Sequence, residues 1–119
     1  MRISVGTFQE TSERTGVAFT ATPPPGFQGE IISRALPNPL LFHRYKSGQI
    51  SRTEFVSQYL EWLTQKDMNR LLSVITDGVC ILCWDDVFDM VALCTLCGVI
   101  ASTGTYIDGY DEMIKRCSD

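Results

Sequence analysis

The sequence has little positive charge, a single histidine and no long uninterrupted apolar run. Its 10 lysine and arginine residues are outnumbered by 14 aspartate and glutamate residues, which gives the 119-residue chain a formal net charge of −4. Proteins that bind nucleic acid through the phosphate backbone normally carry a basic surface, so this balance disfavours a nucleic-acid partner. The longest apolar segment, residues 87–100, is interrupted by Asp89 and is shorter than the about 20 residues that span a bilayer. No membrane partner is therefore expected.

Secretory and metal-binding signals are also weak. Residues 1–6 do not lead into the apolar core of a signal peptide, and an odd number of cysteines, 5, does not suit a disulfide framework. Reduced thiols in the cytoplasm are therefore expected. Four cysteines have the spacing C-x2-C-x10-C-x2-C, which is typical of zinc sites: Cys80, Cys83, Cys94 and Cys97. Because both pairs lie in strongly apolar segments rather than in turns, we expect buried thiols and predict no metal and no cofactor.

The clearest positive signal is in residues 78–86, which predict a buried strand at the centre of the fold. An Asp-Gly turn precedes a short apolar run, residues 79–84, and two carboxylates end it. The apolar segment that follows predicts a helix with Asp85 or Asp86 as its N-cap. Cys83 is then expected at the carboxyl end of a central strand, where open α/β sheets usually place their sites.

Alternating and helical patterns around this strand predict a single α/β domain over residues 1–119, with a small, mainly parallel sheet of about four strands flanked by helices. The other strands are expected near residues 3–8, 17–21 and 105–107. Prolines and glycines predict a loop over residues 22–37. Helices are expected, from their caps and periodicity, at residues 39–46, 51–65, 67–77, 86–101 and 110–117. We expect a three-layer or two-layer domain, with helices on both sides of the central strand to bury both of its faces.

Three residues at the end of the central strand are candidates for chemistry: Cys83, Asp85 and Asp86. A thiolate at a strand end that faces a helix N-terminus has a lowered pKa, which would make Cys83 a nucleophile. A site that binds an anion also needs basic groups, and here the two aspartates supply negative charge. With Asp89 they could instead hold Mg²⁺, but we favour helix capping for the pair. No arginine or histidine is left in the expected site, and we expect two aromatic rings and the proline loop to plug the strand end: Trp84 and Phe88.

Motifs along most of the chain resemble the domain of unknown function 488 family. They lie at residues 3–8, 22–29, 40–51, 55–60 and 79–85, and the most specific is Tyr-Lys-Ser-Gly at 45–48, followed by an aromatic helix. The resemblance implies a small cytoplasmic α/β domain without an established reaction. It also implies a site built from a cysteine at the central strand end, a Cys-His-Arg triplet entering the next helix, and an arginine before the Thr-Pro of the loop.

The chain departs from this pattern at its cationic positions. Cys83 retains the strand-end cysteine, but Thr20 stands about where the arginine is expected, and Cys94 is followed by threonine and leucine. This loss favours a non-catalytic interaction or regulatory protein with a protein partner, encoded by a phage or mobile element. The alternative is a small-ligand-binding protein or enzyme that uses Cys83 with Asp85 and Asp86. The candidate ligand-binding residues are Thr20, Thr22, Phe27, Tyr45 and Lys46.

Overall fold

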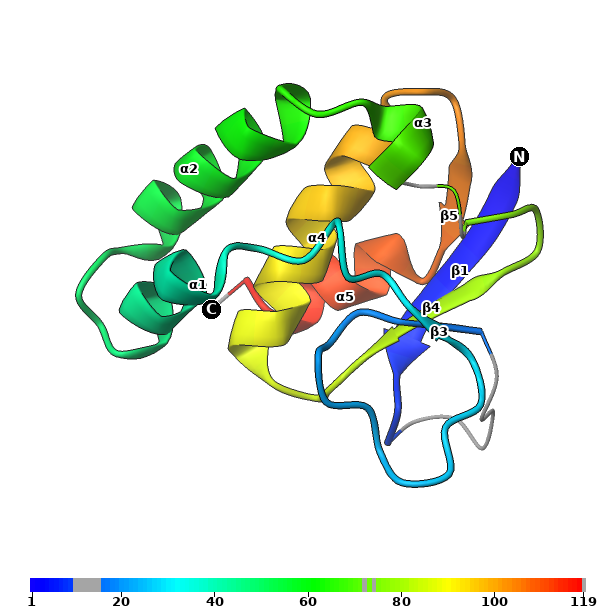
Figure 1. Cartoon of the computed structure of the whole chain (residues 1–119), viewed down its shortest axis with the longest axis horizontal. Helices are drawn as coiled ribbons and strands as arrows, with labels where there is room; N and C mark the ends of the chain where they lie inside the picture. Colours follow the sequence, from blue (N-terminus) through cyan, green and yellow to red (C-terminus); the bar gives the residue numbers. More distant parts are fainter. Residues whose placement is uncertain (10–15, 72, 74, 119) are drawn as a thin grey trace.

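The computed structural model describes residues 1–9, 16–71, 73 and 75–118, and its framework is one parallel sheet (Figure 1). Five strands of the described residues lie in the order β3-β2-β4-β1-β5, and each neighbouring pair is parallel. Their bounds are β1 Arg2–Thr7, β2 Val17–Ala18, β3 Glu30–Ile31, β4 Cys80–Cys83 and β5 Tyr106–Asp108. The middle position of β4 confirms the central strand that the sequence predicts, and the α/β class is confirmed with it.

Strand β3 lies inside the segment that the sequence predicts to be a loop throughout, residues 22–37. It is only 2 residues long, so no alternation of side chains could mark it. Its place comes from the backbone of β2: the Ile32 N–H donates to the carbonyl oxygen of Ala18 at 3.0 Å. The pairing adds a fifth strand at one edge of the sheet and holds the segment before α1 close to β2.

The helices follow the predicted caps closely. In the described residues they are α1 Pro39–Lys46, α2 Arg52–Thr64, α3 Met68–Leu71, α4 Val87–Ala101 and α5 Tyr110–Arg116. The side chain of Ser51 accepts the Glu54 N–H at the start of α2, and Asp86, rather than Asp85, caps α4. The helix expected at residues 67–77 is too long: α3 ends at Leu71, and residues 73 and 75–77 are turn or irregular, while residues 72 and 74 lie outside the described residues.

Helix α4 forms a layer of its own between the sheet and α2 (Figure 1). Seven of its side chains are buried, and only Val87 and Gly98 among its residues are exposed, as is typical of a largely enclosed helix. The sheet supplies Ile3, Val5 and Ile81 to this core, and α2 supplies Phe55, Tyr59 and Leu63 from the other side. The main core therefore lies between the sheet and α2, with α4 running through it.

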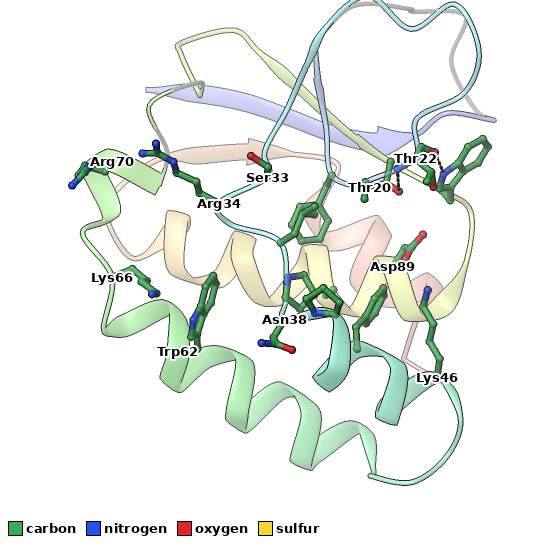
Figure 2. A pocket seen from close by; sticks show the side chains of 18 of the residues that line it. Thr20, Thr22, Ser33, Arg34, Asn38, Lys46, Trp62, Lys66, Arg70 and Asp89 are labelled. Carbon is green, nitrogen blue, oxygen red and sulfur yellow. Dashed lines mark hydrogen bonds between the residues drawn. The ribbon is translucent and has the colours of Figure 1, made fainter.

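Helices α1, α2, α4 and α5 lie on one side of the sheet (Figures 1 and 2). The expectation of helices on both sides of the central strand is therefore wrong. Side chains of β4 alternate as the sequence predicts: Ile81 and Cys83 face the helices, whereas Leu82 belongs to a smaller cluster on the opposite face. Aromatic rings cover that cluster in place of a helix, with the Phe8 and Trp84 ring centroids 5.0 Å apart. Burial of both faces of a strand thus needs no second helical layer.

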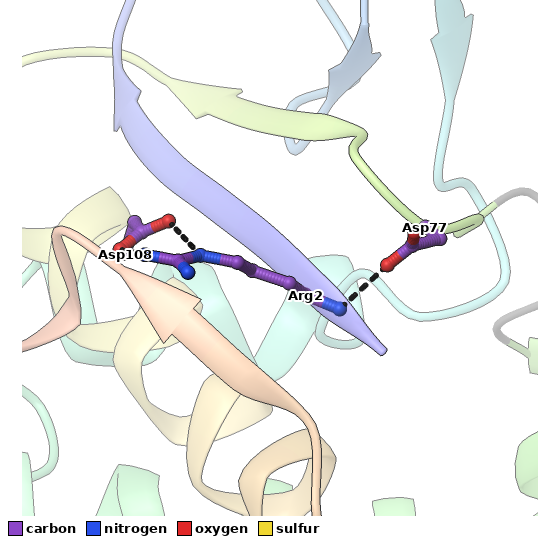
Figure 3. Close-up of polar contacts among 3 residues, drawn as sticks. All are labelled: Arg2, Asp77 and Asp108. Atoms are coloured by element: carbon purple, nitrogen blue, oxygen red, sulfur yellow. Dashed lines mark hydrogen bonds and ion pairs between the residues drawn. The ribbon is translucent and has the colours of Figure 1, made fainter.

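An exposed ion pair joins β1 to the edge strand β5, on the side of the sheet away from β3 (Figure 3). The Arg2 side chain donates to both carboxylate oxygens of Asp108 at 2.9 and 3.1 Å, and its backbone N–H donates to Asp77 Oδ1 at 2.7 Å. The Arg2 guanidinium lowers the pKa of Asp108 in return. These contacts fix β5 and the turn before β4 to β1.

Among the described residues no helix has both the length and the apolarity needed to traverse a bilayer.

Candidate functional site

A pocket of about 800 Å³ opens at the carboxyl ends of β2 and β4 (Figure 2). Its walls come from the segments that follow these strands, from the segment before α1, from α1, α2 and α4, and from the region of α3. Pockets that hold small molecules usually have volumes of about 300–1,000 Å³, and open α/β sheets place them at this end of the strands. The position and the size are therefore those of a ligand site.

Trp84 forms a wall of this pocket rather than a plug. Its indole Nε1 donates a hydrogen bond to the carbonyl oxygen of Thr22 at 3.0 Å, which holds the ring against the segment after β2. Phe88, the other ring of the expected plug, packs edge-on against Tyr45 with centroids 4.9 Å apart. The expectation of a closed strand end is wrong because each ring has its own packing partner, and the space beside Trp84 stays open.

Arg34 and Ser33 reach the pocket because their neighbours anchor the backbone. Ile32 and Ala35 are buried on either side of them. The Ile32 N–H bonds to β2, and the Ala35 N–H donates to the Ile32 carbonyl oxygen at 3.3 Å. The two residues between these anchors are exposed and line the pocket. The two buried residues therefore hold Ser33 and Arg34 at the wall of the pocket.

Three further basic side chains enter from helical segments. Lys46 ends α1, Lys66 follows α2, and Arg70 belongs to α3. The Lys46 ammonium lies 4.2 Å from the centroid of the Phe42 ring, and the Lys66 ammonium lies 5.0 Å from that of Trp62. Within the part of the chain that the structure describes, the pocket's basic side chains make no ion pair. They are free to meet an anion that enters.

Two carboxylates, those of Asp67 and Asp89, also line the pocket. Asp67 Oδ1 accepts the Asn69 N–H at 3.0 Å at the start of α3. Burial, and then the nearby Asp86 carboxylate, raise the pKa of Asp89 to about 6, while Lys46 acts in the opposite direction. Because four basic side chains face two acidic ones, the pocket is basic in a chain whose net charge is −4.

Three of the five candidate ligand-binding residues line the pocket: Thr20, Thr22 and Lys46. The other two lie elsewhere, since Phe27 packs in the cluster on the opposite face of the sheet and Tyr45 is buried in the main core. Sequence motifs placed these two rings beside a site, but their packing against other aromatic side chains takes them away from it.

Cys83, Asp85 and Asp86 are not arranged as a reactive site. Cys83 is 0% exposed, and burial, followed by the charge of Asp89, raises the pKa of its thiol. A thiol of this kind stays protonated near neutral pH. Asp85 Oδ1 pairs with Arg116 Nη2 at 2.5 Å, and Asp86 caps α4. None of the three lines the pocket, so the structure gives them structural contacts.

The four cysteines with zinc-like spacing are divided between the two faces of the sheet. Cys80 packs with the cluster on the opposite face, whereas Cys83, Cys94 and Cys97 belong to the main core or its edge. Within the residues that the structure describes, no three histidine, cysteine, aspartate or glutamate side chains form a group that could hold a metal ion. The alternation of β4 is the reason, because residues three apart on a strand point to opposite faces.

Four residues that line the pocket were not predicted as site residues: Arg34, Trp62, Lys66 and Arg70. The prediction that no arginine is left in the site is therefore wrong. No motif links these residues, because they come from the segment before α1, from α2 and from the segment after it. A basic pair at residues 66 and 70, close behind a helix end, is the one local signal in the sequence. The fold supplies the rest by bringing the segments together.

Comparisons with known proteins do not identify the chain. No family model matches it. No curated protein and no solved structure matches it either. The resemblance to the domain of unknown function 488 family therefore rests on sequence motifs alone, and function has to be argued from the pocket.

Proposed function

We propose that this protein is a non-catalytic binding protein whose pocket at the carboxyl ends of β2 and β4 holds a small organic anion. One observation carries the proposal: basic side chains from separate segments converge on a cavity of about 800 Å³ without ion-pair partners among the described residues. Grouping like charges without a partner is unfavourable, and a bound anion would offset that cost.

A binding role fits the pocket better than a catalytic one. The reactive candidates at the strand end are buried or engaged: Cys83 in the core, Asp85 with Arg116, and Asp86 as a helix cap. Side chains that do line the pocket include hydroxyls, amides, aromatic rings and cations, which recognise a ligand without needing to react with it. The alternative in which Cys83 acts as a nucleophile would need an exposed thiolate.

Ligand-observed NMR with a library of neutral, cationic and anionic small molecules tests the proposal. Ser33→Trp fills the pocket from an exposed position, and Ser57→Trp makes the same change on the exposed surface of α2, away from the pocket. Anionic library members are expected to bind the wild-type protein and Ser57→Trp, and to lose binding to Ser33→Trp. Binding that survives in Ser33→Trp, or a library without a single binder, contradicts the proposal.

Protein binding is the second candidate function, and a groove of about 620 Å³ between α2, α4 and α5 favours it. Its lining is mostly apolar, and two large side chains on it are exposed, Leu60 at 40% and Ile114 at 38%. An amphipathic partner helix is the occupant that suits such a groove. Cross-links from a co-purified partner should map to this groove and disappear in Leu60→Glu; cross-links elsewhere on the surface oppose the candidate.

The proposal places the protein in the cytoplasm, where its five cysteines can remain thiols as they are in the structure. Membership of the domain of unknown function 488 family, and an origin in a phage or mobile element, stay proposals that rest on the sequence motifs. They predict relatives with more basic residues at the same strand end.

A further inference from the structure

The pocket has two chemically different ends (Figure 2). Arg34, Lys66 and Arg70 lie at one end of the view, with Trp62 beside them, and Thr20, Thr22, Asp89 and Lys46 lie at the other. Aromatic and other apolar groups also line the pocket, among them Phe19 and Phe42. The first end gathers three cations and suits an anion, whereas at the second end the Asp89 carboxylate lies near Lys46, so a neutral group with hydrogen-bonding atoms suits it.

We infer that the pocket binds an organic phosphate whose other end is a flat ring with N–H donors, the chemistry of a nucleoside monophosphate. This inference rests on the proposed ligand-binding function and specifies its ligand. The binding is non-covalent, so no bond in the ligand changes.

The cationic end suits a phosphate monoester better than a single carboxylate. A phosphate monoester carries a charge of about −1.5 to −2 near neutral pH and has three acceptor oxygens. Two guanidinium groups, Arg34 and Arg70, can each donate a pair of hydrogen bonds to such oxygens, and Lys66 adds a third cation. The one carboxylate lining this end, Asp67, already accepts the Asn69 N–H. The charges thus balance when a dianion is bound.

Lys66 gives the ring of the ligand a place to lie. Its ammonium rests over the indole of Trp62, whose other neighbour is the ring of Tyr59, stacked with centroids 6.1 Å apart. A phosphate offers this ammonium a stronger partner than the indole does. When Lys66 turns toward the phosphate, the vacated face of Trp62 becomes available for stacking with a flat ring.

The far end can read the donors of that ring. The Asp89 carboxylate accepts hydrogen bonds when ionised, and because it offsets the charge of Lys46 this end has no surplus of cations for a phosphate. Thr20 Oγ1 accepts the Thr22 N–H at 3.2 Å, which leaves its own hydroxyl hydrogen for a ring nitrogen or oxygen. The surplus of cations at the first end therefore favours the orientation in which the phosphate lies there and the ring points toward Asp89.

Isothermal titration calorimetry near neutral pH with the 5′-monophosphates of adenosine, guanosine, cytidine and uridine tests the inference. Each is compared with its own nucleoside, with ribose 5-phosphate and with inorganic phosphate. At least one monophosphate is expected to bind about tenfold more tightly than its nucleoside and than ribose 5-phosphate, and its affinity should fall as salt is added.

Matched variants locate the phosphate. Arg34→Gln and Arg70→Gln should each weaken that monophosphate by about tenfold, whereas Arg44→Gln, an exposed change on α1 outside the pocket, should leave its affinity unchanged. Equal binding of nucleoside and monophosphate, or unchanged affinity in both pocket variants, overturns the inference. If the four monophosphates fail but other library molecules bind and are blocked by Ser33→Trp, the ligand class is wrong and the binding function stands. If nothing binds, both fail.

Discussion

The Asp89 carboxylate links the pocket to pH. Its pKa of about 6 in the folded protein lies above the value of about 4 in the unfolded chain, so the native state binds this proton more tightly. The stabilisation that this tighter proton binding gives the native state is present below the unfolded pKa and is lost as pH rises through about 6. The charged groups that act on it are Asp86, which disfavours its ionised form, and Lys46, which favours it; Asp89 in turn raises the pKa of the neighbouring Cys83 thiol.

We predict that the free energy of unfolding falls by about 1–2 kcal/mol between about pH 4 and pH 7 on account of Asp89, after allowance for solvent screening of this half-buried group. Asp89→Asn should remove that fall, and Glu61→Gln, an exposed change on α2, should keep it. Urea denaturation across this pH range measures both. A wild-type slope in Asp89→Asn would mean that another group titrates.

Cys83 is predicted to matter for stability. Cys83→Ser puts a hydroxyl among apolar groups, with no partner assured, and should lower the free energy of unfolding by about 1–3 kcal/mol. The native thiol should react slowly with iodoacetamide, and denaturant should speed the reaction, because the side chain is 0% exposed. Mass mapping of the alkylated protein measures the rate of labelling at Cys83 and compares it with the rate at Cys80, which is only partly buried. Rapid selective labelling of Cys83 would restore the nucleophile hypothesis.

At the scale of elements, one hydroxyl ties α2 to the wall of the pocket. The Tyr59 hydroxyl donates to the carbonyl oxygen of Ala35, and both residues are 0% exposed. Tyr59→Phe leaves this buried carbonyl oxygen without its donor, so we predict a loss of about 1–3 kcal/mol in the free energy of unfolding. Tyr106→Phe, at a position 60% exposed, is the matched control and should change little. Equal losses in the two variants would show that the hydroxyl of Tyr59 contributes nothing specific.

The approach of β2 to β4 depends on a glycine. Gly16 has φ +112°, and a Cβ there would lie 2.5 Å from the carbonyl oxygen of Cys80. Gly48 also has a positive φ, +80°, but a Cβ there would meet nothing within 4 Å. Gly48→Ala should therefore cost about 1 kcal/mol of stability for backbone strain, and Gly16→Ala clearly more, because strain and a backbone clash add. Thermal denaturation measures the loss of stability in the two variants. Similar losses would argue against the close approach of Gly16 to the backbone of Cys80.

For the molecule as a whole, local chemistry made the elements predictable. The cap at Ser51, the Asp86 cap and the apolar run before Trp84 each act within a few residues, so the helices and the central strand could be read from the sequence. The placement of the helices on one face of the sheet could not be predicted in the same way. An apolar strand such as β4 is buried on both faces whether a helix or a group of aromatic rings covers it.

The pocket was less predictable than the fold because it depends on distant parts of the chain. Thr20 and Thr22 could be proposed from their place after a strand, but Arg34 and Arg70 come together only when β3 pairs with β2 and α3 follows α2. A 2-residue strand has too few side chains to show a pattern, and that strand positions the segment that carries Arg34. The net charge of the chain also hid a locally basic cavity.

The position of β1 in the sheet has a consequence for the order of events during synthesis. Residues 2–7 are made long before their hydrogen-bonding neighbours, β4 and β5, at residues 80–83 and 106–108. Helices α1 and α2 can form from local contacts while β1 still lacks both neighbours. Pairings between distant residues close slowly, so β1 joins the sheet only after residues 80–108 have been made. Until then, Ile3 and Val5 expose an apolar strand that a nascent-chain chaperone could cover.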